Sequence, residues 1–306
     1  MNDNLIFKGV YSALVTPLDK AGQLNCNAVA ELVEYQLAAG LNGFYLCGGT
    51  GEGPALALET RRKMVECAIA ANRGRGKVIV QVGGSVRVDE AFALAEHAAK
   101  CGADGLSSVP PSLYYQYSED DTVNYYQELA RRTSLPVLVY RTASFAGATM
   151  MSLMSRLLQV PNIIGLKYTG TSYYEMWKLT TLNDGNINVI NGADETLICG
   201  LVSGAQAGIG ALYNLIPEEF AALYRAFQAG DLENARRHQR NICASVATLG
   251  KFIHGEGIIP PLKAAMESRG MPAGLPAYPA VALPPEQYEK LASAFEEVHS
   301  NFEKEQ

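Results

Sequence analysis

The sequence predicts a (β/α)8 barrel, a TIM barrel, with a C-terminal helical segment, on three observations. Eight short apolar runs alternate with longer stretches of helical periodicity. Most of these runs are apolar throughout, which is typical of parallel strands buried on both faces. The eight strand–helix units occupy roughly 230 residues, which is the count and the size of such a barrel. An open doubly wound sheet is the alternative, because it has the same alternation.

The predicted strands follow one another from the start of the chain. They are Val10–Val15, Phe44–Cys47, Val78–Val82, Gly105–Val109, Val137–Tyr140, Ile163–Lys167, Ile187–Asn191 and Ala207–Leu212. The helices between them are most clearly marked over Asn27–Ala39, Glu59–Ala71, Asp89–Cys101 and Glu119–Arg132. Gly40 and Gly102 end the first and third of these helices. Acidic residues open the fourth helix and Arg131 and Arg132 close it, which suits the helix dipole.

The strand pattern stops after about residue 225. Helical patterns then cover Glu233–Gly250, Ile258–Arg269 and Pro285–Glu303, with a link rich in Pro and Gly over Gly270–Pro279. We therefore predict a barrel over residues 1–225 and a helical segment packed on it over residues 226–306.

The composition is that of a globular protein, and it disfavours certain kinds of partner. With 48% apolar and 18% charged residues over 306 positions, the chain has ample material for a core. Its net charge of −6 and its lack of a Lys/Arg tract disfavour nucleic acid and anionic membranes as partners. We expect no membrane span, because every apolar run is interrupted early, and the first residues lack the features of a signal peptide.

The cysteines and histidines give little support to metal chemistry. The six cysteines are scattered and form no CxxC motif, so we expect reduced thiols that act as small buried hydrophobes in a cytoplasmic protein. The four histidines are far apart, and none pairs with another at ligand spacing. We therefore expect no metal.

Barrel enzymes place their reacting groups at the C-terminal ends of the strands. The candidate residues there are the Gly48–Gly53 loop after the second strand, Tyr140 ending the fifth, Lys167 ending the sixth, Asn191–Glu195 after the seventh, and Gly208–Ala211 on the eighth. The loop offers small residues whose backbone N–H groups can approach an anion, together with the Thr50 hydroxyl. A plain turn between the strand and the helix is an equally good interpretation of this loop.

Lys167 is the most informative candidate. A lysine seldom ends an apolar strand for stability, because burying an ammonium is costly. A lysine partly removed from water has a lowered pKa and can form a Schiff base with a ketone or an aldehyde. The alternative is a lysine whose stem packs and whose head reaches solvent, and position alone leaves the two open.

These motifs together resemble the pyruvate-dependent class I aldolases of the N-acetylneuraminate lyase and dihydrodipicolinate synthase family. The resemblance runs from about Gly9 to about Gly270. It rests on GxTGE at Gly49–Glu52 with Gly48 before it, the fifth-strand tyrosine, Gly-Leu-Lys on the sixth strand and GxDE after the seventh, in order and at family spacing.

The resemblance implies a role for each candidate residue. Lys167 forms a Schiff base with the keto carbon of pyruvate or of another 2-oxo acid, so no cofactor is needed. Tyr140 moves the proton of the aldol hydroxyl, and Tyr114, chosen over Tyr115, reaches a neighbouring subunit's site. The substrate is held by Gly49, Thr50, Thr169, Gly192, Asp194, Glu195, Gly210 and Ala211. The resemblance also implies a homotetramer.

The positions that set specificity favour the lyase branch. Gly192, Asp194 and Glu195 match the residues that contact a sugar-like tail, and paired carboxylates suit a polyol. Phe145 stands where the synthases have an arginine for a substrate carboxylate. The first expectation is therefore cleavage of N-acetylneuraminate to N-acetylmannosamine and pyruvate.

Three departures keep other readings open. Gly49 and Ala211 each replace a hydroxyl residue of the family, and Arg141 follows Tyr140 where the family has asparagine. A water filling the space at Gly49 is one hypothesis for the proton relay, and Arg141 binding a carboxylate or phosphate of an unusual substrate is another. The alternatives are an aldolase for another 2-keto-3-deoxy sugar acid, a condensing synthase, or a non-catalytic 2-oxo acid binding protein.

Overall fold

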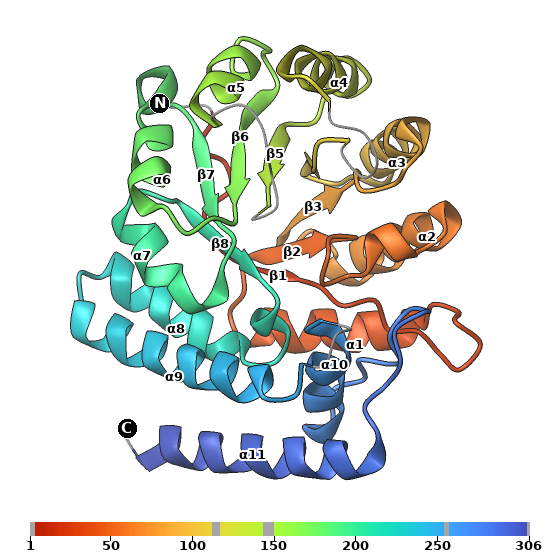
Figure 1. Ribbon diagram of the computed structural model, residues 1–306, viewed down its shortest axis with the longest axis vertical. Coiled ribbons are helices and arrows are strands. Elements are labelled where there is room, and N and C mark those ends of the chain that lie inside the picture. The colour runs from red at the N-terminus through yellow and green to blue at the C-terminus, as the bar shows by residue number, and fades with distance from the viewer. Residues whose placement is uncertain (1–3, 112–116, 143–149, 254–256, 305–306) are drawn as a thin grey trace.

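The computed structural model describes residues 4–111, 117–142, 150–253 and 257–304. Over these ranges, eight parallel strands form a closed barrel in sequence order, and helices surround it (Figure 1). The strands are β1 Gly9–Ala13, β2 Gly43–Leu46, β3 Lys77–Gln81, β4 Gly105–Ser108, β5 Val137–Arg141, β6 Ile163–Tyr168, β7 Asn188–Asn191 and β8 Ala207–Gly210. The predicted (β/α)8 barrel is confirmed, and the open sheet is excluded because β8 pairs with β1.

Each predicted strand is present, with its ends shifted by at most two residues. The largest difference at a C-terminal end that bears on the site is in β8, which we predict to reach Leu212 but which ends at Gly210. There the backbone turns, because Asp194 Oδ2 accepts hydrogen bonds from the N–H groups of Ala211 and Leu212, at 3.1 and 2.9 Å. A carboxylate from the preceding strand–helix connection therefore ends this strand.

The helices alternate with the strands and then continue alone. They are α1 Cys26–Ala38, α2 Leu58–Asn72, α3 Val88–Cys101, α4 Glu119–Arg131, α5 Met150–Leu157, α6 Tyr173–Thr180, α7 Leu197–Val202, α8 Pro217–Gln228, α9 Leu232–Gly250, α10 Ile259–Ser268 and α11 Pro285–Lys304. Short 3-10 turns lie at η1 Gly53–Ala55, η2 Leu182–Gly185, η3 Asp194–Thr196 and η4 Leu212–Asn214. Gly102 ends α3 in the left-handed region at φ 88°, as its place in the sequence predicts.

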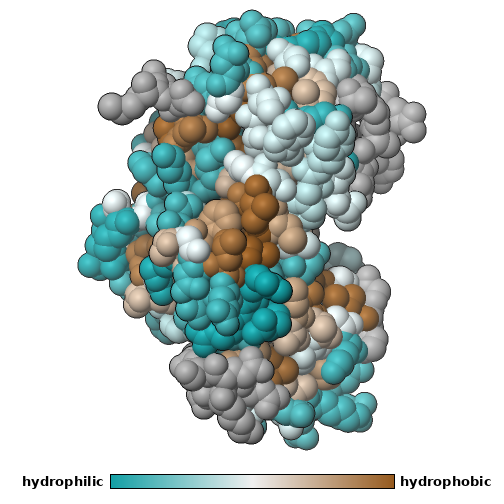
Figure 2. Space-filling view, turned by 90° about the vertical axis from the view of Figure 1, so that its left-hand side faces the viewer, coloured by the Kyte–Doolittle hydropathy of each residue, from teal (hydrophilic) through white to brown (hydrophobic). Residues whose placement is uncertain are grey.

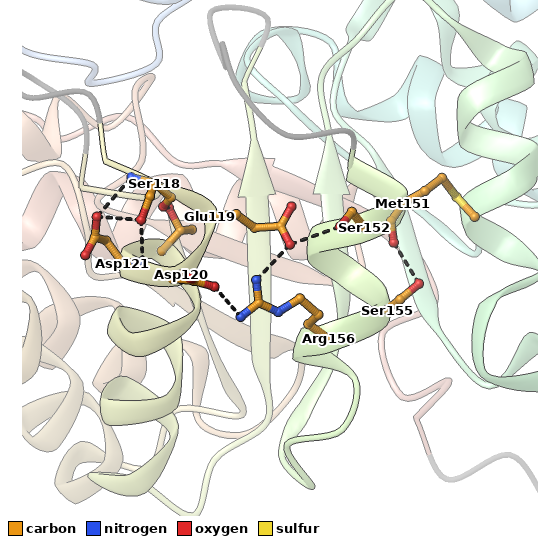
Figure 3. A network of polar contacts seen from close by, with 9 residues as sticks. Ser118, Glu119, Asp120, Asp121, Met151, Ser152, Ser155 and Arg156 are labelled. Carbon is orange, nitrogen blue, oxygen red and sulfur yellow. Dashed lines mark hydrogen bonds and ion pairs between the residues drawn. The ribbon is translucent and has the colours of Figure 1, made fainter.

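Polar contacts fix the start of α4 and its packing on α5 (Figure 3). Ser118 caps α4 and forms a reciprocal capping box with Asp121. On α5, the guanidinium of Arg156 bridges Glu119 and Asp120 in the first turn of α4, at 2.9 and 2.7 Å. These contacts join two neighbouring helices of the outer ring.

The C-terminal helices lie together on one side of the barrel. In Figure 1, α9, α10 and α11 occupy the lower part of the view, beyond α8 and α1. The boundary that we predict after residue 225 falls within α8, and the division into a barrel and a helical segment stays a prediction. Among the described residues, no helix combines the length and the apolarity needed to cross a bilayer.

Two apolar cores hold the fold together. The larger core lies between the strands and the surrounding helices. The smaller one fills the barrel interior and comprises Phe7, Tyr11, Ala13, Tyr45, Ile79, Leu138, Ile164, Ile190, Ala207 and Ile209, with Tyr140 packed against it. Filled layers of this kind make the barrel a solid support, so a polar group in its uppermost layer needs a specific explanation.

The expectation of six reduced, buried cysteines is wrong. Cys26 and Cys67 form a disulfide between α1 and α2, with their Cα atoms 5.6 Å apart. Of the four free cysteines, only Cys47 is buried. The pairing could not be predicted from the sequence because the two residues lie 41 positions apart, on helices that the barrel topology makes neighbours.

Candidate active site

A buried lysine occupies the C-terminal end of β6. Lys167 is 4% exposed, and its Nζ lies 4.3 Å from the ring centroid of Tyr140 and 4.5 Å from that of Tyr45. The two rings meet edge to face with centroids 6.2 Å apart. The two rings cover the lysine head and keep water away from it. The reading in which the lysine head reaches solvent is therefore wrong.

Tyr140 lies directly across from this lysine, because the two are register partners in β5 and β6. Burial raises the pKa of the Tyr140 phenol. The ammonium of Lys167 and the nearby hydroxyl of Thr169 lower it, and they prevail, so its pKa lies below the ordinary value. A phenol of this kind, next to an amine, is suited to accept and return a proton.

Tyr45 is a site residue that the sequence did not reveal. On β2 its side chain points into the barrel, and its hydroxyl donates a hydrogen bond to Ser107 Oγ at 3.1 Å. A Cβ on Gly48 would lie 2.6 Å from its ring, so Gly48 must be glycine for the loop to rest on Tyr45. The signal was the alternation of the second strand, but a tyrosine in an apolar strand is more often plain core.

The loop over Gly48–Gly53 is a tight turn. The N–H groups of Glu52 and Gly53 close it by donating to the carbonyl oxygens of Gly49 and Gly48, both at 3.0 Å. Those two amides are thus engaged, which leaves the amides of residues 49–51 as candidates for an anion. Thr50 is half-buried and Gly49 is exposed. A Cβ on Gly49 would meet no atom within 4 Å, so this position has room for a side chain or a water.

A buried ion pair anchors this loop from the C-terminal segment. Glu52 Oε1 lies 2.6 Å from Lys263 Nζ, and the two side chains are 7% and 2% exposed. Lys263 also donates to the carbonyl oxygens of Thr16 and Leu275, both at 2.7 Å, and Glu52 accepts from the N–H of Ala277. Burial lowers the pKa of Lys263, and the charge of Glu52 partly opposes this. The loop thus depends on α10 and on the link after it.

The turn after β7 holds the predicted tail-binding residues. Gly192 donates its N–H to Tyr168 O at 2.9 Å, and a Cβ on Gly192 would collide with Thr169 Oγ1. That hydroxyl is buried and interacts with the Tyr140 phenol. Gly192 and Thr169 therefore lie together beside Tyr140.

Asp194 is buried, whereas Glu195 is exposed. The Oδ2 of Asp194 holds the turn after β8, and a Cβ on Gly210 would collide with its Oδ1. That Oδ1 has no hydrogen-bond partner within the described ranges. Burial and the charge of Glu195 raise the pKa of Asp194 to about 6, although the Ala211 and Leu212 amides and Lys167 oppose the shift. Asp194 thus joins Gly210 and Ala211 to the site, chiefly as a structural group.

Arg141 points away from the barrel interior. Its Nη1 donates to Thr169 O at 3.3 Å, its Nη2 lies 3.7 Å from Glu175, and its guanidinium stands 5.0 Å from the Tyr168 ring centroid. The guanidinium of Arg141 is therefore already engaged by other groups of this protein. This disfavours the hypothesis that Arg141 binds a substrate anion.

Two residues named in the sequence analysis have no described position, and a metal site can be sought only among the residues that do. Tyr114 and Phe145 lie outside the described residues. Where the structure does describe the chain, no three His, Cys, Asp or Glu side chains gather as metal ligands. The site as described is an amine, two phenols, a glycine loop and a buried carboxylate.

Comparison with known proteins agrees with the geometry of the site. The sequence pattern described as "Dihydrodipicolinate synthetase family" matches residues 6–298. An N-acetylneuraminate lyase of Rhizobium meliloti strain 1021 is 35% identical over 268 residues, 87% of each chain. A 4-hydroxy-tetrahydrodipicolinate synthase of Syntrophus aciditrophicus is 32% identical over 266 residues, 87% of this chain and 89% of its own.

Solved structures agree with these relatives. The structure of an N-acetylneuraminate lyase from Proteus mirabilis matches with a TM-score of 0.88 at 25% identity, over 95% of this chain and 98% of its own. The names of the relatives describe two different reactions, so they leave the substrate open.

Proposed function

Because this chain belongs to the dihydrodipicolinate synthetase family and is a carbon–carbon lyase, we propose that it cleaves N-acetylneuraminate to N-acetylmannosamine and pyruvate. The observation that carries the proposal is the amine of Lys167, buried at the end of β6 between the rings of Tyr45 and Tyr140. An amine in this setting is the nucleophile that a Schiff-base reaction requires.

The proposed reaction begins at Lys167. This lysine loses a proton to solvent, and the neutral Nζ adds to the keto carbon of the 2-oxo acid. The keto oxygen takes up two protons, one from Nζ and one from solvent, and leaves as water, so an iminium remains. Tyr140 then accepts the proton of the substrate hydroxyl beside the bond that breaks, and that bond's electron pair moves into the iminium. An aldehyde leaves, and an enamine stays on the lysine. Tyr140 returns the proton to carbon, and one water releases pyruvate and restores Lys167.

The rest of the site orients the substrate. Thr50 and the amides of residues 49–51 hold the carboxylate, in a loop that the buried pair of Glu52 and Lys263 supports. Thr169, Gly192, Asp194, Glu195, Gly210 and Ala211 form the side that faces the sugar-like tail. No cofactor enters the reaction. Tyr114 of a neighbouring subunit is proposed to complete the proton relay.

Cleavage of another 2-keto-3-deoxy sugar acid is the second candidate. The observation that favours it is the open space at Gly49, together with the absence of a hydroxyl at Ala211. Both features change the groups offered to a substrate while Lys167 and Tyr140 remain. Condensation of the synthase type, suggested by the name of the Syntrophus relative, comes after it.

Reductive trapping tests the central step. The protein is incubated with pyruvate and borohydride, and the adduct is located by peptide mass spectrometry. We expect a stable adduct on Lys167 and none in Lys167→Met, while Lys178→Met, which removes a half-buried lysine of α6, still traps. Absence of an adduct in the wild type would overturn the Schiff-base proposal and leave a non-catalytic binding protein.

Pyruvate release decides the substrate. N-acetylneuraminate and 2-keto-3-deoxygluconate are compared in a coupled assay that measures kcat/KM. A higher value for N-acetylneuraminate supports the first proposal, and cleavage of only the other acid supports the second.

We also propose a homotetramer in the cytoplasm, acting on small 2-oxo acids. Exposed apolar residues support self-association: Tyr174 and Trp177 of α6, which stack on each other, and Val202 of α7 are 69%, 52% and 68% exposed. Figure 2 looks onto the side of the molecule that carries α6 and α7 in Figure 1, and apolar residues gather near the centre of that face. Apolar patches on a globular protein mark interaction sites.

A further inference from the structure

A polar side chain of α9 grips the turn that carries Asp194 and Glu195. Gln239 is 8% exposed, and its side-chain amide uses both ends. Its Oε1 accepts the N–H of Ile198 at 2.9 Å, and its Nε2 donates to Asp194 O at 3.2 Å. The two backbone groups lie on either side of Glu195, so one side chain spans the η3 turn.

A second contact lies one helical turn further along α9. The Sγ of Cys243 donates to Glu195 O at 3.4 Å, and Nε2 of Gln239 lies 3.7 Å from the same sulfur. Residues four apart share one face of a helix. The carbonyls of Asp194 and Glu195 are therefore both held by a single face of α9.

The helix that supplies these contacts is itself fixed. Nδ1 of His238 lies 2.8 Å from Glu219 Oε2, and Nδ2 of Asn241 donates to the same oxygen at 3.1 Å. Glu219 belongs to α8, a helix of the barrel. Gln239 and Cys243 thus lie on a helix that is itself held in place, and we call these two residues the bracket of the η3 turn.

From this geometry we infer that Gln239 is a positioning residue that determines specificity for the aldehyde half of the substrate. It does not touch substrate, and it acts by fixing where Asp194 and the exposed Glu195 stand. The inference rests on the proposed function. In the proposed site the pyruvate half is bound elsewhere, by Lys167 and the Thr50 loop, so we expect its binding to be independent of this bracket.

The test compares Gln239→Met, which keeps the volume and removes both polar ends, with Ser245→Ala. Ser245 is a buried residue of α9 whose hydroxyl donates to Asn241 O within the same helix, and within the described ranges it has no polar contact with the η3 turn. In Gln239→Met we expect the KM for N-acetylneuraminate to rise about 10-fold, because buried backbone groups lose their partners. If the wild type does not cleave that acid, 2-keto-3-deoxygluconate replaces it. Adduct formation with pyruvate and borohydride should stay within about 2-fold of the wild type.

Amide hydrogen exchange provides a readout that does not need activity. Residues 194–198 should exchange about 10-fold faster in Gln239→Met and at the wild-type rate in Ser245→Ala. Cys243→Ser, which keeps a donor, should retain the KM of the wild type, whereas Cys243→Ala should raise it. Unchanged exchange, or a loss of pyruvate adduct in step with the rise in KM, would overturn the inference. A wild type that traps no pyruvate refutes the proposed function instead. Amide hydrogen exchange of residues 194–198 then still tests whether Gln239 holds the turn.

Discussion

Tyr140 has two functions in one side chain. Its ring contacts the ammonium of Lys167, and its hydroxyl is the proposed proton carrier. Burial opposes ionisation of this phenol, whereas Lys167 and Thr169 favour it, and the net effect is a pKa below the ordinary value. The positive charge of the lysine therefore prepares its neighbour to act as a base.

Tyr140→Phe separates these two functions. The ring remains against Lys167, so we expect the pyruvate adduct to form under borohydride. Release of pyruvate from N-acetylneuraminate should fall by about 10²–10⁴-fold, because the proton carrier is gone. Peptide mass spectrometry and the coupled assay measure the two. Equal loss of adduct and of cleavage would show that the hydroxyl is needed for lysine placement instead.

Gly49 and Gly210 are expected to differ sharply in their tolerance of a side chain. A Cβ on Gly49 meets open space, so Gly49→Ala should change the free energy of unfolding by no more than about 0.5 kcal/mol. A Cβ on Gly210 would collide with Asp194, so Gly210→Ala should cost about 1–3 kcal/mol. Urea denaturation measures both. Gly49→Ser should also raise the cleavage rate, if a water now does the work of the missing hydroxyl.

Asp194 makes stability depend on pH in a defined direction. Its pKa rises from 3.8 to about 6 on folding, so the folded chain holds this proton more tightly than the unfolded chain. Its contribution to stability is complete below about pH 4 and is lost as the pH rises through 6. Relative to Asp194→Asn, the wild type should lose up to about 3 kcal/mol between pH 4 and pH 7 in urea denaturation. A difference that stays constant over this range would contradict the prediction.

Some site residues could be predicted from the sequence and others could not, for a physical reason. Lys167 stands out because a charged residue ending an apolar strand is costly without a purpose. Tyr45 does not, because burial of a tyrosine inside a barrel is ordinary packing. The sequence does not indicate Gln239 either, because its partners are backbone groups that no side-chain motif reveals.

At the scale of elements, the Gly48–Gly53 loop is supported by α10 as well as by the strand before it. Left-handed backbone at Cys47 and Glu52, both with φ 57°, shows that the loop is held in a conformation these residues rarely adopt. The buried pair of Glu52 and Lys263 supplies part of that restraint. The GxTGE motif predicts the loop, but the partner of its glutamate lies in a helix with no motif of its own.

Lys263→Met tests this dependence. It leaves the Glu52 carboxylate buried without its counter-charge, which should lower the free energy of unfolding by about 3–5 kcal/mol. The concentration of pyruvate needed for half-maximal trapping should rise as well, because the loop loses its support. Arg87→Met is the matched control, since Arg87 pairs with Asp89 on the exposed surface and should change neither measurement. Equal behaviour of the two variants would contradict the prediction.

At the scale of the whole molecule, the fold was predictable because a strand–helix rhythm repeated eight times has few compact solutions. Strand ends shifted by at most two residues, and at β8 the shift follows from the hydrogen bonds that Asp194 accepts from the turn after the strand. The disulfide of Cys26 and Cys67 was not predictable, because it depends on which outer helices are neighbours.

Association of chains is predicted to involve the apolar residues on α6 and α7. Val202→Asp places a charge among them and should reduce the mass measured by light scattering from four times the 32.9 kDa of one chain. Val281→Asp is the control, because Val281 is 63% exposed, close to the 68% of Val202, and belongs to the link before α11. An unchanged mass in Val202→Asp, or an equal change in both variants, would place the interface elsewhere.

The buried pair of Glu52 and Lys263 also has a consequence for synthesis. A growing chain that ends before residue 263 already contains all eight strands, yet Glu52 has no counter-charge and the N–H of Ala277, 225 residues later, has not been made. The Gly48–Gly53 loop therefore gains these two supports only when the last helices leave the ribosome. In the order of synthesis, the candidate site is completed after the strands of the barrel.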